Sequence, residues 1–157
     1  MTRREIHGFV TSWVRAWAAE DLEALLACYD DDAELVSPLL GTVRGISAIE
    51  RSHQDLFLAF ADVEVEVHDV VIDEEQQRAV LIFTIHATQQ GEFLGFPASR
   101  RRTATLSAYA FTLKNGRIGS ERRLYDYAGF LMQLGILKTR NVCDQAALPG
   151  PGRAAII

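Results

Sequence analysis

The stretch "ERRLYDYAGFLMQLG", Glu121–Gly135, joins an extended pattern to a helical one. Successive side chains of a strand point to opposite faces, so Arg122 and Arg123 face opposite sides of the predicted strand. After Asp126, apolar residues recur at helical spacing at Phe130, Leu131 and Leu134. The segment therefore predicts a strand that leads into an amphipathic helix. If one face of the strand is buried, one arginine of the pair is directed toward the core.

The composition is that of a single soluble domain. The chain has 157 residues, of which 48% are hydrophobic and 24% charged, enough for one substantial core. Its net charge of −5 gives no reason to expect nucleic acid or an anionic membrane as a partner. The N-terminus has no apolar leader, and no apolar run reaches the ~18 residues of a spanning helix, so we expect a cytoplasmic protein.

Helices are predicted toward the N-terminal end. Apolar residues at helical spacing indicate a first helix over residues 6–17 and a second over residues 22–29, which Asp21 caps. We interpret the acidic triplet Asp30–Asp32 as a solvated turn that ends the second helix. Gly45 opens a third helix, whose apolar face extends to Phe60.

Strands are predicted over most of the remaining chain. A short strand covers residues 33–37, and four more cover 63–67, 78–88, 103–113 and 118–125. Asn115 and Gly116 supply the positive φ angles of a type I′ turn between the last two. This order predicts an α+β domain in which three N-terminal helices pack on a curved, mostly antiparallel sheet. Such a sheet leaves a conical hollow, which is a natural small-molecule site.

Four stretches resemble one known superfamily. They are "YDDDAELVSPLLGTVRG" (29–45), "GEFLGFPASRRRT" (91–103), "AFTLKNGRI" (110–118) and "DYAGFLMQLG" (126–135). Together they resemble the NTF2-like or ketosteroid-isomerase-like cone, and within it the SnoaL-like polyketide cyclase family. The similarity covers roughly residues 6–137, so we expect one domain over 1–137 and a tail of little regular structure over 138–157. The resemblance also implies a homodimer that pairs through the outer face of the sheet.

Active members of that family close polyketide rings by intramolecular aldol chemistry, without a metal or an organic cofactor. The resemblance implies an acid/base aspartate at position 123, where this chain has Arg123. On the preceding strand, it implies that Tyr109 stands in place of the family's histidine and Ser107 in place of its glutamine. A second histidine of the family, just before the glycine loop, corresponds to Gln89. Because each of these groups is exchanged, we expect the cyclase activity to be altered or absent.

Two related chemistries also lack an essential residue. The resemblance to ketosteroid isomerases puts their base aspartate at Ser37 and their oxyanion tyrosine at Trp13, with Tyr109 near their second oxyanion donor. The sequence has no Asp-x-Arg-x-Asp-like arrangement of the kind that limonene-epoxide hydrolases use. Asp126 matches an aspartate common in the family, and it is either the cap of the last helix or a catalytic acid.

Arg123 has several interpretations. Pointing inward, it would place a permanent cation in a mostly apolar hollow, which costs several kcal/mol unless the cation is paired. The partner could be Glu121, Glu92, Asp126 or an anionic ligand group, since arginine is favoured for carboxylate and phosphate recognition. A bulge could instead turn the side chain outward, or it could pair with a carboxylate at the rim.

The leading prediction is a SnoaL-like protein that binds a small hydrophobic or polycyclic ligand and needs no metal or cofactor. Its expected ligand contacts are Trp13, Trp17, Tyr29, Ser37, Gln89, Ser107 and Tyr125. If the protein is catalytic, Tyr109 is the oxyanion donor, Arg123 the electrophile or carboxylate clamp, and Asp126 the proton carrier. One alternative is a non-catalytic binding or interaction module of the same fold. Another is a conventional cyclase whose acid/base is Asp126 or His86.

Overall fold

A computed structural model describes residues 1–138 of the chain. The described residues form four helices, α1 (Arg3–Ala18), α2 (Leu22–Leu26), α3 (Ile46–Ala59) and α4 (Tyr127–Leu134). They form six strands, β1 (Tyr29–Ser37), β2 (Gly41–Arg44), β3 (Phe60–Asp73), β4 (Arg78–Gln89), β5 (Arg102–Lys114) and β6 (Arg117–Tyr125). From position 139 onward the predicted tail lies outside the described residues.

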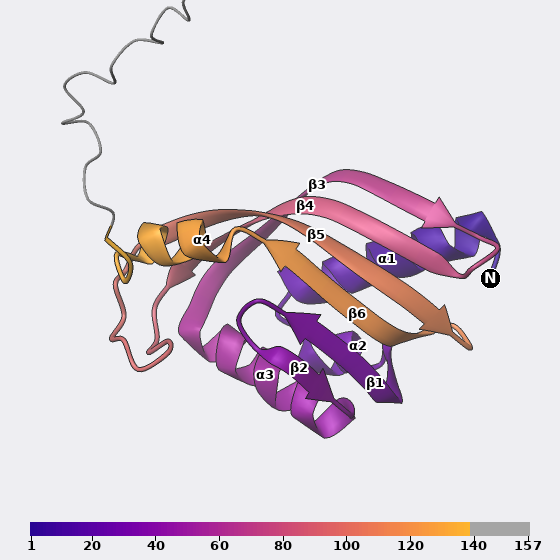
Figure 1. The fold of residues 1–157 in the computed structure, drawn as a ribbon, viewed down its shortest axis with the longest axis horizontal. Helices are drawn as coiled ribbons and strands as arrows, with labels where there is room; N and C mark the ends of the chain where they lie inside the picture. Colours follow the sequence, from indigo (N-terminus) through magenta and orange to yellow (C-terminus); the bar gives the residue numbers. More distant parts are fainter. Residues whose placement is uncertain (139–157) are drawn as a thin grey trace, which may run out of the picture.

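The strands form one curved sheet in the order β2-β1-β6-β5-β4-β3. Strand β1 runs parallel to β6, and the other neighbouring pairs are antiparallel. In Figure 1, α1 lies behind the sheet, α3 lies beside β1 and β2, and α4 follows the end of β6. The predicted α+β cone with a mostly antiparallel sheet is therefore confirmed.

The N-terminal part of the sheet differs from the prediction in two places. Tyr29, predicted in the second helix, and Asp30–Asp32, predicted as a turn, belong to β1, and β2 was not predicted at all. Aspartate is a poor strand former, so local preference argued for a turn. Pairing with β6, far along the chain, overrides that preference, and a register shift between Tyr29 and Glu34 leaves Asp31 and Asp32 exposed.

The predicted cap of the second helix and the predicted turn of the last hairpin are confirmed. Asp21 caps α2, since its Oδ1 accepts a hydrogen bond of 3.0 Å from the backbone N–H of Ala24. Asn115 and Gly116 both have positive φ, 52° and 80°, as a type I′ hairpin turn between β5 and β6 requires. The register of β6 therefore follows from the turn as well as from its buried face.

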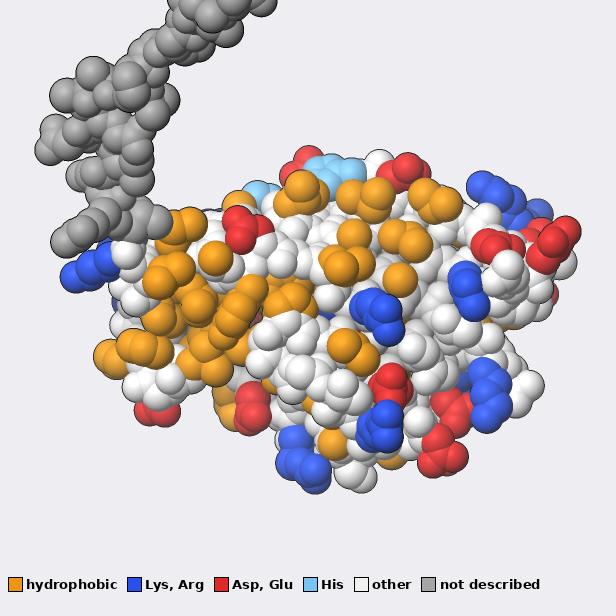
Figure 2. Space-filling model, in the orientation of Figure 1, with side chains coloured by type: hydrophobic (Ala, Val, Ile, Leu, Met, Phe, Trp, Pro, Cys, Tyr) orange, Lys and Arg blue, Asp and Glu red, His pale blue; other side chains and the backbone are white. Residues whose placement is uncertain are grey.

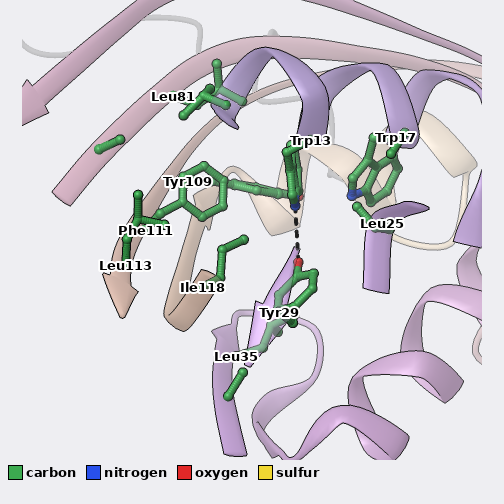
Figure 3. Close-up of a cluster of buried hydrophobic side chains, with 14 of the residues drawn as sticks. Trp13, Trp17, Leu25, Tyr29, Leu35, Leu81, Tyr109, Phe111, Leu113 and Ile118 are labelled. Atoms are coloured by element: carbon green, nitrogen blue, oxygen red, sulfur yellow. Dashed lines mark hydrogen bonds between the residues drawn. The ribbon is translucent and has the colours of Figure 1, made fainter. Parts of the chain in front are cut away.

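The closed part of the core lies between α1 and the sheet. Trp13 of α1 is fully buried, with its ring 5.2 Å from Phe111 and 5.8 Å from Tyr109, measured between centroids. Figure 3 shows its indole directed at the hydroxyl of Tyr29 from β1. No helix among residues 1–138 is long and apolar enough to cross a bilayer.

Candidate functional site

A cavity lies between the sheet and the helices, on the side of the core away from Phe111. Its empty volume is about 690 Å³, including the part that is open to solvent. Along β5, the alternate residues Thr103, Thr105, Ser107 and Tyr109 face the cavity, whereas Phe111 and Leu113 belong to the closed core. The sheet and α1 therefore converge at one end and leave room for a ligand at the other.

Most of the cavity wall is apolar. The aromatic lining residues other than tyrosine are Trp17, Phe57, Phe60 and Phe130, from α1, α3, β3 and α4. Apolar side chains also gather on the surface at the end of the molecule that carries α4 (Figure 2). Met132 of α4 is 37% exposed, and Leu94 and Phe96 of the segment between β4 and β5 are 50% and 45% exposed. The end of the molecule that carries α4, whose Phe130 lines the cavity, is therefore apolar on its surface as well.

The polar lining comes chiefly from the last two long strands. The lining hydroxyls belong to Ser37, Thr103, Thr105, Ser107, Tyr109 and Tyr125, and the lining cation is Arg123. On β6, Glu121 and Arg123 are buried while Arg122 and Leu124 are exposed, so the strand alternates as predicted. The inward interpretation of Arg123 is confirmed, because its residue exposure is 4%.

Arg123 is paired with Glu121, one of the partners proposed from the sequence. Its Nε donates a hydrogen bond of 2.5 Å to Glu121 Oε1, and Glu121 is completely buried. The other carboxylate oxygen, Oε2, accepts a hydrogen bond from the hydroxyl of Tyr29. That hydroxyl in turn accepts one of 3.3 Å from Trp13 Nε1. The buried carboxylate is therefore held by a donor on each oxygen, which offsets the cost of its burial.

His53 of α3 completes this buried network. Its Nδ1 lies 2.9 Å from the carbonyl oxygen of Ile49, and its Nε2 lies 2.9 Å from Arg123 Nη2. A carbonyl can only accept and a guanidinium can only donate, so Nδ1 carries the proton and Nε2 accepts. The ring is therefore a neutral imidazole with its lone pair directed at Arg123.

The electrostatics of the network follow from burial and pairing. Burial, together with the Arg123 charge, lowers the pKa of His53 to about 3. Burial alone would lower the pKa of Arg123, but the charge and hydrogen bond of Glu121, together with Tyr109 and Tyr29, outweigh burial and raise that pKa further above its usual range. Burial raises the pKa of Tyr109 and of Tyr125. At neutral pH the site therefore holds one cation, one anion and neutral tyrosines.

Tyr109 is the second polar group of interest. Its ring centroid lies 4.9 Å from the guanidinium carbon of Arg123, within cation–π range. The ring also packs edge-on against Phe83, with centroids 4.8 Å apart. No residue in the described part of the chain forms a hydrogen bond with its hydroxyl, although the residue lines the cavity. The hydroxyl is therefore free to donate to a ligand.

The structure brings together six of the ten site residues predicted from the sequence. Those that line the cavity are Trp17, Ser37, Ser107, Tyr109, Arg123 and Tyr125. Two others, Trp13 and Tyr29, lie behind them as the buried support of Glu121. The remaining two, Gln89 and Asp126, are not among the lining residues.

Gln89 and Asp126 make local structural contacts instead. Gln89 Oε1 accepts a hydrogen bond of 3.1 Å from the backbone N–H of Ser99, which anchors the loop after β4. Asp126 is exposed and caps α4, since its Oδ1 accepts a hydrogen bond of 2.8 Å from the backbone N–H of Gly129. His86, the other proposed acid/base, lies on β4 with its Nε2 3.6 Å from Glu66 Oε2, and it does not line the cavity.

His53 is the site residue that the sequence did not single out. It lies four residues after Ile49, the spacing of residues on one helix face, and its Nδ1 contacts the carbonyl of Ile49. The bond to Arg123 joins residues 70 positions apart, so only the tertiary structure places them together. Among residues 1–138, no group of three or more His, Cys, Asp or Glu side chains is arranged to hold a metal ion.

The family model that matches this chain is the SnoaL-like domain, over residues 10–120. The chain belongs to the SnoaL-like family. The match spans five of the six strands completely and the start of β6, but it stops just before Glu121. Membership therefore establishes the fold. The matched region does not include Glu121, Arg123 and Tyr125, the inward-facing residues at the end of β6. No curated protein sequence matches it significantly.

Solved structures agree with this assignment. AclR from Streptomyces galilaeus, provisionally named a hydroxylase, is 23% identical with a TM-score of 0.77, covering 87% of this SnoaL-like chain and 100% of its own. TsrD from Streptomyces laurentii is 24% identical with a TM-score of 0.76, over 87% and 99% of the two chains. A protein from Jannaschia sp. CCS1, provisionally named a SnoaL-like polyketide cyclase, is 19% identical with a TM-score of 0.77, over 86% and 94%. At these identities the likeness establishes the fold.

Proposed function

We propose that this SnoaL-like protein binds a small, largely apolar ligand in the cavity and does not use a carboxylate there as a proton carrier. The observation that supports the proposal is Arg123. It occupies the position at which the family resemblance implies an acid/base aspartate, it lines the cavity, and Glu121 and His53 hold it in place. The apolar walls supply the driving force for binding, at roughly 25 cal/mol per Å² of buried apolar surface.

The groups that could transfer protons are occupied elsewhere. The described residues that line the cavity include no aspartate, glutamate or histidine. Glu121 accepts hydrogen bonds from Tyr29 and Arg123, and His53, with a pKa of about 3, is a weak base at neutral pH. Asp126 is committed to the cap of α4. General acid/base catalysis needs a group with a pKa near the working pH within reach of the substrate, and no such group among residues 1–138 lines the cavity.

Dye binding tests the proposal. The neutral apolar dye N-phenyl-1-naphthylamine should bind in the cavity and gain fluorescence. Ala87 is 4% exposed and lines the cavity, so Ala87→Phe fills it and should weaken dye binding at least tenfold. Ala104 is exposed on the next strand, and Ala104→Phe is the matched control that should leave binding unchanged. If the wild-type protein binds no dye, the interaction-module alternative is favoured instead.

A second candidate function is cofactor-free enolisation of a bound ketone, in which solvent water or hydroxide takes the α-proton because no described lining residue is a base. The observation that favours it is the pair of donors at the cavity, Arg123 as electrophile and the free hydroxyl of Tyr109 as oxyanion donor. Proton NMR can follow deuterium uptake at the α-carbon of 1-tetralone in D2O. Acceleration that Tyr109→Phe removes would establish catalysis. An uptake rate equal to that of the buffer supports binding alone.

A further inference from the structure

We propose that the ligand is a neutral molecule whose carbonyl-type oxygen accepts hydrogen bonds from Arg123, and that the site rejects carboxylates. This deepens the proposed binding function and rests on it. The inference depends on three features of the described residues. These are the unused donors of Arg123, two unpartnered buried atoms beside the cavity, and the charge balance of the site.

Arg123 carries donors that no described residue uses. Its Nε is bonded to Glu121 and its Nη2 to His53, while Nη1 has no partner among residues 1–138. The ring of Tyr109 lies within cation–π range of the guanidinium. Because Arg123 lines the cavity and a guanidinium has no acceptor, the free N–H groups require an acceptor atom from a ligand or water.

Two further polar atoms lack a partner beside the same cavity. Trp17 Nε1 and Thr105 Oγ1 are the buried side-chain nitrogen and oxygen atoms that form no hydrogen bond among the described residues. Both residues line the cavity. Buried polar atoms without a partner are rare in folded proteins, and the indole N–H can only donate. The indole N–H of Trp17 therefore adds one donor to the lining residues, whereas the Thr105 hydroxyl can donate or accept.

The charge balance decides between a neutral acceptor and an anion. Arg123 is the one charged residue in the described lining, and Glu121 already neutralises it. A ligand carboxylate would add a net negative charge beside two side chains that are 3% and 0% exposed, and burying an uncompensated charge is costly. A ketone, quinone or lactone oxygen accepts the same hydrogen bonds without that charge. Arg123 therefore suits the electrophile role better than the carboxylate clamp.

Three probes with one carbon skeleton test this assignment by isothermal titration calorimetry at pH 7.5. They are tetralin, 1-tetralone and tetralin-1-carboxylate. We expect 1-tetralone to bind about tenfold or more tightly than tetralin, since a hydrogen bond to a charged donor contributes roughly that factor. The carboxylate should bind weakest of the three. Arg122→Met, next to Arg123 but on the exposed face, is the control that should preserve this order.

Two variants separate the charge argument from a merely structural role. Glu121→Gln leaves the Arg123 cation uncompensated, so the carboxylate should gain at least tenfold relative to 1-tetralone, which reverses the preference. The double variant Glu121→Gln/Arg123→Met removes both charges, and it should lose most of the preference for 1-tetralone over tetralin, keeping only what the Tyr109 hydroxyl supplies. Because it leaves no unpaired buried charge, it keeps the test open if Arg123→Met alone fails to fold.

The outcomes distinguish this inference from the function on which it rests. Equal binding of the three probes by the wild-type protein, or a preference for the carboxylate, overturns the carbonyl assignment while the binding function stands. An unchanged preference in Glu121→Gln overturns the charge argument and the assignment with it. If none of the probes and no dye binds, the proposed binding function fails and the inference fails with it.

Discussion

Arg123 and Glu121 lie two residues apart on one face of β6, and the guanidinium Nε donates a hydrogen bond of 2.5 Å to the carboxylate Oε1. Their side chains are 3% and 0% exposed, so neither charge has water to replace its partner. The pair explains how an apolar core accommodates an arginine. It also makes each residue depend on the other, because removal of one leaves a buried charge without compensation.

The first prediction concerns this dependence. Glu121→Ala should lower the free energy of unfolding by about 3–5 kcal/mol, the usual cost of breaking a buried ion pair. Urea denaturation monitored by tryptophan fluorescence measures it. Arg122→Ala, one residue away on the exposed face, should change stability by no more than about 0.5 kcal/mol. A loss below about 1 kcal/mol in Glu121→Ala would show that the pair is not the support of the site.

The second prediction compares two buried tyrosines that differ in hydrogen bonding. Tyr29 accepts from Trp13 and donates to Glu121, so Tyr29→Phe leaves two buried groups unpaired and should cost about 1–3 kcal/mol. The hydroxyl of Tyr109 has no partner among the described residues, so Tyr109→Phe should change stability by about 0.5 kcal/mol or less. The same variant should weaken binding of 1-tetralone. Equal destabilisation by the two substitutions would contradict this division of roles.

The fold and part of the site could be predicted from the sequence because local rules agree with the tertiary structure there. The Asn115-Gly116 turn fixes the last hairpin, and the alternation of β6 places Arg123 and Tyr125 on one side and Arg122 on the other. Four of the six expected residues that line the cavity, Ser107, Tyr109, Arg123 and Tyr125, lie on these two strands. Where a strand alternates and a turn sets its register, spacing alone determines which side chains face inward.

The rest could not be predicted because it depends on contacts between distant segments. β1 includes three consecutive aspartates and forms a strand through its pairing with β2 and with the distant β6. His53 resembles any packing residue of an amphipathic helix until the fold places it 2.9 Å from Arg123. The commitment of Asp126 to a helix cap and of Gln89 to a loop also required side-chain geometry.

The third prediction follows from the pKa of His53, which is about 3 in the folded protein and about 6.5 in the unfolded chain. Between these values the unfolded state binds a proton that the folded state does not bind. Stability should therefore fall as the pH drops below about 6.5, by about 2 kcal/mol between pH 7 and pH 5. The charged or titratable groups that contact the ring are Arg123 and Tyr29, and neither titrates in this range.

The measurement is the free energy of unfolding at pH 5 and pH 7 for the wild-type protein and for His53→Gln. Glutamine can accept the hydrogen bond from Arg123 but does not titrate. The variant should lose most of the difference between the two pH values that the wild-type protein shows. An identical pH dependence in both proteins would mean that His53 is protonated in the folded state.

The fourth prediction concerns the outer face of the sheet, through which we propose that two copies of the chain pair. Leu106 of β5 and Leu124 of β6 are 62% and 55% exposed on this face, and apolar side chains are spread over it in Figure 2. Glu66 is exposed on β3, at one edge of the sheet, and Arg122 is exposed on β6, nearer the middle of the sheet. If the two sheets pack face to face about a two-fold axis parallel to the strands, β3 of one copy lies over β6 of the other. Glu66 of each copy then lies near Arg122 of the other, so opposite charges meet.

Analytical ultracentrifugation at micromolar concentration tests this pairing. The wild-type protein should sediment as a dimer, and the double variant Leu106→Glu/Leu124→Glu should sediment as a monomer with the same circular dichroism spectrum. Leu58→Glu is the control, because Leu58 is 79% exposed at the end of α3, away from the sheet face. A wild-type monomer at these concentrations would contradict the proposal.

The last prediction separates the two interpretations of Asp126. As the cap of α4, it accepts a hydrogen bond of 2.8 Å from the N–H of Gly129, and Asp126→Ala should therefore cost about 1 kcal/mol of stability. Asparagine caps a helix almost as well as aspartate, but its amide cannot act as an acid or a base near neutral pH. If Asp126 is only a cap, Asp126→Asn should keep both the stability and any deuterium uptake of bound 1-tetralone. If Asp126 were a proton carrier, Asp126→Asn would keep normal unfolding in urea but lose the uptake. Because the carboxylate is exposed and does not line the cavity, we expect the pattern of a cap.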